Sequence, residues 1–77
     1  ARRRLAGLSG KDLVNALLRG GFRIVRISGS HHILQHPDVA GSRVIVPVHR
    51  AQDLPPGTIR SIVEQSGLTV DELLALL

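Results

Sequence analysis

Apolar residues recur at helical spacing near the start of the chain. Ser9 is a suitable N-cap residue, and Asp12 at the third helical position is favourable near the positive end of the helix dipole. Gly21 ends the pattern, so that Phe22 falls where it can pack back on Leu17. Between these two ends, the apolar face of the predicted helix consists of Leu13, Val14, Leu17 and Leu18. The pattern predicts an amphipathic first helix.

Two further helices are predicted at the other end of the chain. Pro55-Pro56-Gly57-Thr58 leads into one whose inner face is Ile59, Ile62 and Val63, and Gly67 ends it. Thr69 with Glu72 three residues later forms a capping box, which starts a third, short helix. Leucines occur on all sides of this short helix. We therefore expect it to pack on the second helix, and the alternative is that something outside this chain covers part of its apolar surface.

The middle of the chain reads as strands separated by turn residues. The predicted strands are Arg23–Ile27, His31–His36 and Arg43–Val46. Ser28-Gly29-Ser30 is a turn, and Pro37–Ser42 is a polar loop. Short connections favour an antiparallel three-stranded sheet. With helices on one face, the expected fold is a two-layer α+β domain in the order helix, three strands, helix, short helix.

Length and composition narrow the class of protein. A chain of 77 residues suffices for one domain. The absence of cysteine excludes disulfides and thiolate metal sites. No apolar run approaches the roughly 18 residues of a membrane span, so a soluble cytoplasmic protein is expected, with no membrane association.

Charge is distributed unevenly along the chain. The formal net charge is +4, and all ten Lys and Arg residues lie at or before Arg60. A basic body favours polyanionic partners, although a surface that merely confers solubility is an equal alternative on charge alone. Phe22 is the only aromatic residue, which argues against base-stacking platforms. We expect residues 1–7, with Arg2-Arg3-Arg4, to form a flexible basic arm before a single domain at 8–77.

Four histidines invite a metal hypothesis, which strand geometry disfavours. They are His31, His32, His36 and His49. On a strand, His32 and His36 would lie roughly 13 Å apart along one face. Zinc ligands sit ~2 Å from the ion, and His31 and His32 point to opposite faces. No metal is expected.

Catalysis by a histidine is the remaining chemical hypothesis. Ser30 precedes His31, but adjacent strand residues diverge, which disfavours a Ser-His nucleophile. A lone histidine can serve as a general acid or base in RNA cleavage, because the RNA 2′-OH attacks its own phosphate. Gly29 and Ser30 offer backbone N–H groups to a phosphate, and Arg26 and Arg43 offer charge. The alternative is that His31 is simply a polar residue beside a turn.

Several short motifs together resemble the HicA toxin family, also called YcfA-like. The motifs are Gly21-Phe22, Gly29-Ser30-His31-His32, His36-Pro37, Val46-Pro47, Leu54-Pro55-Pro56-Gly57-Thr58 and Gly67-Leu68. Their order and spacing cover almost the whole chain, from Leu8 to Leu77. The resemblance implies a double-stranded-RNA-binding-like fold, α-β-β-β-α, which agrees with the order read from the pattern.

The resemblance also implies an activity and a partner. It implies a metal-independent endoribonuclease, an mRNA interferase that blocks translation, without a cofactor and with a HicB-like antitoxin as partner. The family's catalytic histidine corresponds to His31, and the glycine that shapes the active loop corresponds to Gly29, with Ser30 beside it. His32 is common in the motif without being catalytic. The residues we expect to contact RNA are Arg26, His32, Arg43 and Arg60.

Two function hypotheses follow. The first is a toxin that cleaves mRNA with His31 as the single acid–base residue. One histidine cannot easily move both protons at once, so water, an arginine or another histidine would supply the second role. The alternative is a non-catalytic double-stranded-RNA binder, for which the second helix, with Arg60 beside Glu64, offers a thin phosphate footprint. A degenerate toxin that survives as an interaction module is a third possibility.

Overall fold

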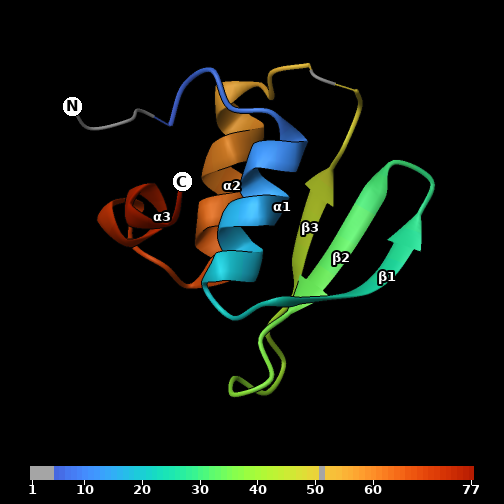
Figure 1. Ribbon diagram of the computed structural model, residues 1–77, viewed down its shortest axis with the longest axis vertical. Coiled ribbons are helices and arrows are strands. Elements are labelled where there is room, and N and C mark those ends of the chain that lie inside the picture. The colour runs from blue at the N-terminus through green and yellow to red at the C-terminus, as the bar shows by residue number, and fades with distance from the viewer. Residues whose placement is uncertain (1–4, 51) are drawn as a thin grey trace.

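Three antiparallel strands form one layer of the protein, and two helices cover one of its faces (Figure 1). The computed structural model describes residues 5–50 and 52–77. The elements run in the order α1 (Gly10–Arg19), β1 (Arg23–Ser28), β2 (His31–Gln35), β3 (Val44–Pro47), α2 (Pro56–Ser66) and α3 (Val70–Leu76). The sheet order is β1-β2-β3. The predicted two-layer α+β architecture is confirmed.

The strand ends differ slightly from the sequence-based expectation. Ser28 belongs to β1 because the turn after it has only two residues, which lets Ser28 pair with His31. His36 falls outside β2. Pro47 ends β3, a position where a proline costs no ladder hydrogen bond.

The predicted boundaries of α1 are confirmed. Ser9 and Asp12 form a reciprocal capping box, with backbone-to-side-chain distances of 3.0 and 3.2 Å. At the other end, Gly21 takes a φ of +95°, and the Phe22 N–H donates to the Leu17 carbonyl at 3.0 Å. These caps satisfy backbone groups that a helix leaves unpaired at its ends.

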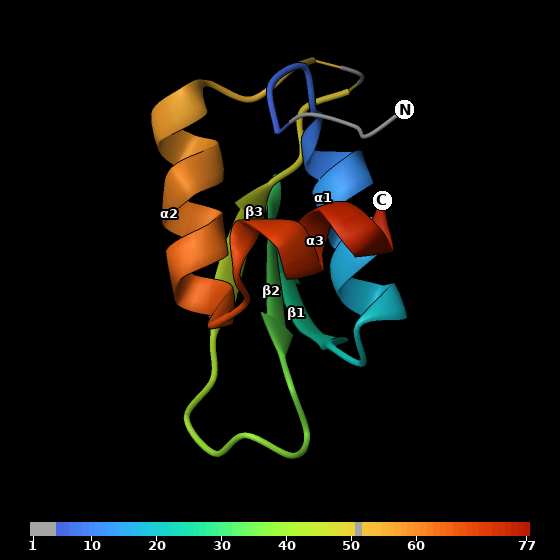
Figure 2. The same ribbon diagram turned by 90° about the vertical axis from the view of Figure 1, so that its left-hand side faces the viewer.

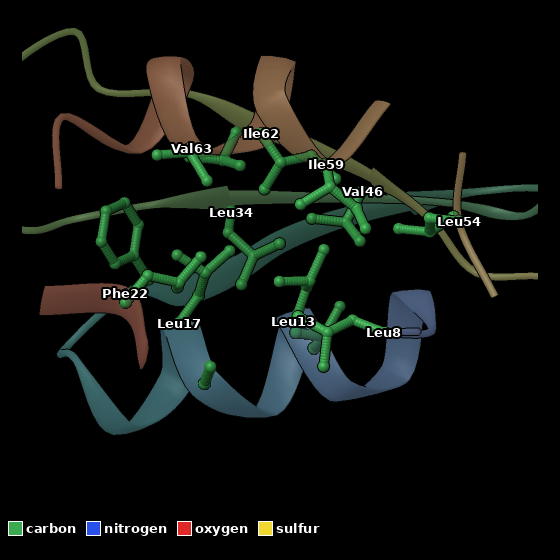
Figure 3. Close-up of a cluster of buried hydrophobic side chains, with 14 residues drawn as sticks. Leu8, Leu13, Leu17, Phe22, Leu34, Val46, Leu54, Ile59, Ile62 and Val63 are labelled. Atoms are coloured by element: carbon green, nitrogen blue, oxygen red, sulfur yellow. The ribbon is translucent and has the colours of Figure 1, made fainter. Parts of the chain in front are cut away.

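The hydrophobic core lies between the two layers (Figure 3). Its largest fully buried side chains are Leu8, Leu13, Leu17, Leu34, Val44, Val46, Ile62 and Leu73. Burial of each such side chain stabilises the fold by about 1.5–3 kcal/mol. The core therefore fixes which face of each strand turns inward and which stays open.

The position of α3 differs from the prediction. We expected it to pack on α2, but Figure 2 shows it crossing the helix layer with its C-terminal end beside α1. Arg19 Nη1 donates to the Leu76 carbonyl at 2.9 Å, and the Leu76 side chain lies against Gly20. The inner face of α2 packs against β3, whereas α3 makes its main helix contact with α1 and contributes Leu73 to the common core.

The start of α3 is defined by its predicted capping box. The Thr69 backbone N–H donates to the Glu72 carboxylate at 2.8 Å, and the Glu72 N–H donates to the Thr69 hydroxyl at 3.1 Å. The bonds from Thr69 hold the pKa of Glu72 below its usual range.

Of the helices in the described parts of the chain, none has the length and apolar character needed to cross a membrane.

The N-terminal segment is described only in part. Arg2, Arg3 and Arg4, which carry the charge of the predicted flexible arm, lie outside the described residues. Leu5, from the same predicted arm, is partly buried and packs against the core.

The two edges of the sheet differ in whether the helix layer contacts them. On the β3 edge, the Ile45 N–H donates to the Gln65 side-chain oxygen of α2 at 2.9 Å. On the other edge, all residues of β1 are exposed, and a bulge interrupts the strand between Ile24 and Arg26. The helix layer thus covers one edge of the sheet and leaves the β1 edge open.

The start of α1 touches the end of β3 with no space for a side chain. A Cβ atom on Gly10 would overlap the Pro47 carbonyl oxygen and lie 3.0 Å from the Val48 Cα. Beside this contact, the Leu54 N–H donates to the Leu8 carbonyl at 2.8 Å. The segment that follows β3 is therefore held against α1 at both its ends.

We expect Gly10→Ala to lower the stability of the protein. The added methyl group would meet backbone atoms, which yield less easily than a side chain, at a cost of about 1–3 kcal/mol. Gly57→Ala is the matched control, since nothing lies within 4 Å of a Cβ at that helical position. Urea unfolding of the three proteins measures the difference. Equal stability of the two variants would contradict the packing described here.

Candidate active site

The outer face of the sheet, opposite the helices, carries the first candidate residue. Pairing places His32 opposite Val46 and Leu34 opposite Val44, and these valines are fully buried under the helices. Side chains alternate along a strand, so His31 points to the opposite, uncovered face. His31 is exposed there, with Ser28 and Pro47 as its cross-strand neighbours.

A two-residue turn presents His31 at the end of the β1–β2 hairpin. Gly29 takes a φ of +58°, whereas Ser30 has a negative φ. This is the φ pattern of a type II′ turn, in which glycine occupies the first central position. The predicted role of Gly29 as a turn residue is therefore explained by its backbone conformation.

Ser30 joins this turn to the segment that follows β3. Its carbonyl accepts a hydrogen bond from the Val48 N–H at 2.7 Å. Its hydroxyl oxygen lies 3.3 Å from Nε2 of His49, within hydrogen-bonding distance. The fold therefore brings a second histidine to the turn, and both His31 and His49 are exposed.

The described residues next to His49 make specific backbone contacts. The Gln52 N–H donates to the His49 carbonyl at 3.2 Å. Between them, Arg50 takes a φ of +51°, a left-handed conformation that is uncommon outside glycine. Farther along the chain, the Leu54 N–H donates to the Leu8 carbonyl just before α1. Sequence reasoning named His49 without placing it, because its position depends on pairing across the sheet. The available signal was its place two residues after the proline that ends β3.

The other two histidines occupy different environments. His32 is half-buried on the helix side, and its Nδ1 is buried without a hydrogen-bond partner among the described residues. His36 lies at the far end of β2, where its Nδ1 accepts from the Asp38 N–H at 3.2 Å. Its ring also packs edge-on against Phe22, with centroids 5.1 Å apart. His36 is thus part of the packing at the end of the sheet opposite the hairpin turn.

The predicted RNA-contacting arginines do not gather at one place. Arg26 pairs with Ile33 and shares the outer face with His31, about 7 Å along the strand direction from it. Arg43 directly precedes β3, at the end of the sheet remote from the turn. Arg60 belongs to α2 and lines a groove with Leu5 in the helix layer. Only Arg26 therefore shares both the face and the neighbourhood of His31.

The described residues contain no group of three His, Cys, Asp or Glu side chains that could hold a metal ion. The separation of the histidines accounts for this, since His31 and His32 lie on opposite faces and His36 lies at the far end. What the turn does assemble is two exposed imidazoles, two backbone segments and a nearby guanidinium. These groups can transfer protons and bind an anion.

Comparison with protein families matches residues 10–68 of the chain to the model for the HicA toxin of bacterial toxin–antitoxin systems. The matched range includes both helices that cover the sheet, all three strands and the turn that presents His31. A comparison with curated proteins finds no match. The match extends over most of the 77 residues, and the chain belongs to the HicA toxin family.

Proposed function

We propose that this toxin is a metal-independent endoribonuclease, an mRNA interferase that cleaves mRNA and blocks translation. The observation that carries the proposal is the exposure of His31 on the open face of the sheet, at the end of a glycine turn. The family match supports the toxin role. Cytoplasmic mRNA would be the substrate, and no cofactor is required.

The chemistry suits a site built from histidine and arginine. RNA contains its own nucleophile, the 2′-OH, so the enzyme must move protons and stabilise charge on the phosphate. Imidazole is the side chain best suited to proton transfer near neutral pH. His31 would exchange a proton with the RNA, and Arg26 on the same face would neutralise the charge that develops on the phosphate.

The open outer face also suits the partner that the family implies. A toxin of a toxin–antitoxin system has an antitoxin, here HicB-like. We propose that the antitoxin shields His31. The half-buried side chain of Ile33 and the exposed side chain of Ile45 lie on the same face and offer apolar surface for such a contact.

Replacement of His31 is the direct test of the proposed activity. We expect His31→Ala to reduce cleavage of a single-stranded RNA by about 10²–10⁴-fold, the usual contribution of one acid–base group. Cleavage by the parent protein should persist in excess EDTA. Electrophoresis of labelled RNA measures both, and circular dichroism checks the fold of the variant. Full cleavage by folded His31→Ala would refute the assignment, and duplex binding without any cleavage would favour a non-catalytic RNA binder.

Replacement of Arg26 tests the path of the RNA. We expect Arg26→Ala to raise KM and to reduce the slope of log affinity against log salt concentration by about 0.7, the value for one contact with a single strand. Arg60→Ala removes the same charge from the other layer, so its effect should be smaller. Titration of labelled RNA at several salt concentrations measures both variants. A larger effect at Arg60 would place the RNA along α2.

A further inference from the structure

The proposed reaction needs two proton transfers at one phosphate. The 2′-OH loses a proton as it attacks, and the 5′-oxygen gains one as it leaves. An arginine was one of the groups expected for the second role, but Arg26, although close to His31, cannot serve either transfer because a guanidinium stays protonated in proteins. A site with His31 alone would depend on water for one of the two steps.

We propose that His49 is the second acid–base residue of this site. The inference rests on the proposed function, because it assumes that RNA is cleaved at the hairpin turn. Its own evidence is the contact between His49 Nε2 and Ser30 Oγ at 3.3 Å, which holds an exposed imidazole beside the residue that precedes His31.

The register of the sheet sets the spacing of the two histidines. Pro47 pairs with His31, and the Val48 N–H bonds to the Ser30 carbonyl, so the ladder continues toward His49. His49 lies two residues beyond the pairing partner of His31, an advance of about 7 Å in an extended chain. A phosphodiester held between two hydrogen bonds of about 3 Å requires a separation of this order. In the proposed site, the two imidazoles contact one phosphate from two sides.

Ser30 orients the His49 ring. Because Nε2 faces the Ser30 hydroxyl, Nδ1 is the nitrogen left to meet the RNA, and it has no partner among the described residues. Ser30 is therefore a positioning residue, which acts through His49. Orientation of His49 is a role for this serine that does not require it to act as a nucleophile.

The charged groups beside the proposed site come from three elements. Arg50 follows it in the loop, and Arg26 lies on the sheet face. Lys11, Asp12 and Asp53 line a hollow between α1 and the loop, together with Arg50 and Val48. The basic side chains outnumber the carboxylates, and an RNA phosphate would bring the compensating negative charge.

The reaction balances with these two histidines and RNA alone. One imidazole, in its neutral form, takes the proton of the 2′-OH as the O2′–P bond forms. The other, as imidazolium, gives its proton to the 5′-oxygen as the P–O5′ bond breaks. The products are a 2′,3′-cyclic phosphate and a free 5′-OH, and the two histidines have exchanged protonation states. Water restores them before the next turnover.

The pH dependence of cleavage tests the pair. We expect the parent protein to show a bell-shaped profile of kcat/KM against pH. His49→Gln retains hydrogen-bonding capacity toward Ser30 but cannot titrate, so we expect a 10²–10⁴-fold loss of kcat/KM and the loss of one limb of the bell. His31→Ala should lose the other limb. Gln52→Ala, an exposed change in the same loop, is the matched control and should retain the whole profile.

The outcomes separate this inference from the proposed function. No cleavage by the parent protein would refute the proposed function itself. If His31→Ala is inactive while His49→Gln keeps the complete bell, the function stands and the second acid–base role of His49 is refuted. A reduced rate with both limbs retained would also refute it, since that is the signature of a structural role. Thermal unfolding of each variant confirms that the comparison is between folded proteins.

A modified RNA identifies which histidine is the acid. After the cleavage position is mapped, its 5′-oxygen is replaced by sulfur, whose thiolate leaves without protonation. We expect the sulfur substrate to restore the rate of the variant that lost the acid and not that of the variant that lost the base. Equal restoration of both variants, or of neither, would overturn the assignment of His31 and His49 as an acid–base pair.

Discussion

The direct contact between Gly10 and the backbone of Pro47 is the constraint on which the arrangement of the site depends. It brings the start of α1 against the end of β3 and so determines where the chain goes after the sheet. The pairing of Leu54 with Leu8 returns the chain to the same place. Between these two points, the Val48 N–H donates to the Ser30 carbonyl, which places the start of the loop beside the hairpin turn. The position of His49 beside Ser30 is a consequence of how a helix and a strand are packed.

Neighbouring residues of strand β2 point alternately into the core and toward the exposed face of the sheet. His32 and Leu34 turn toward the helices, whereas His31 and Ile33 turn away. This alternation is a property of the strand, and the buried Leu34 fixes which residues face outward. A slip of one residue would exchange the two histidines. The identity of the exposed histidine is thus secured by the hydrophobic residues on the other face.

Much of the fold could be predicted from local signals. The starts of two helices were predicted from their capping boxes, Ser9 with Asp12 and Thr69 with Glu72, because capping involves only a few adjacent residues. Alternation likewise indicated that His31 and His32 face opposite ways, which the sheet confirms.

What the sequence could not supply were relationships between distant segments. The packing of α3 on α1 depends on which apolar surface the sheet leaves uncovered. Local patterns also could not show that Arg60 and Arg26, both expected to contact RNA, lie in different layers. The proximity of His49 to Ser30 requires the register of β2 with β3, which no local pattern encodes.

The open β1 edge has a consequence for binding, since a strand added there would extend the sheet within its own plane. It would widen the outer face around Arg26 and leave His31 in contact with solvent, so a partner that pairs with this edge need not cover His31.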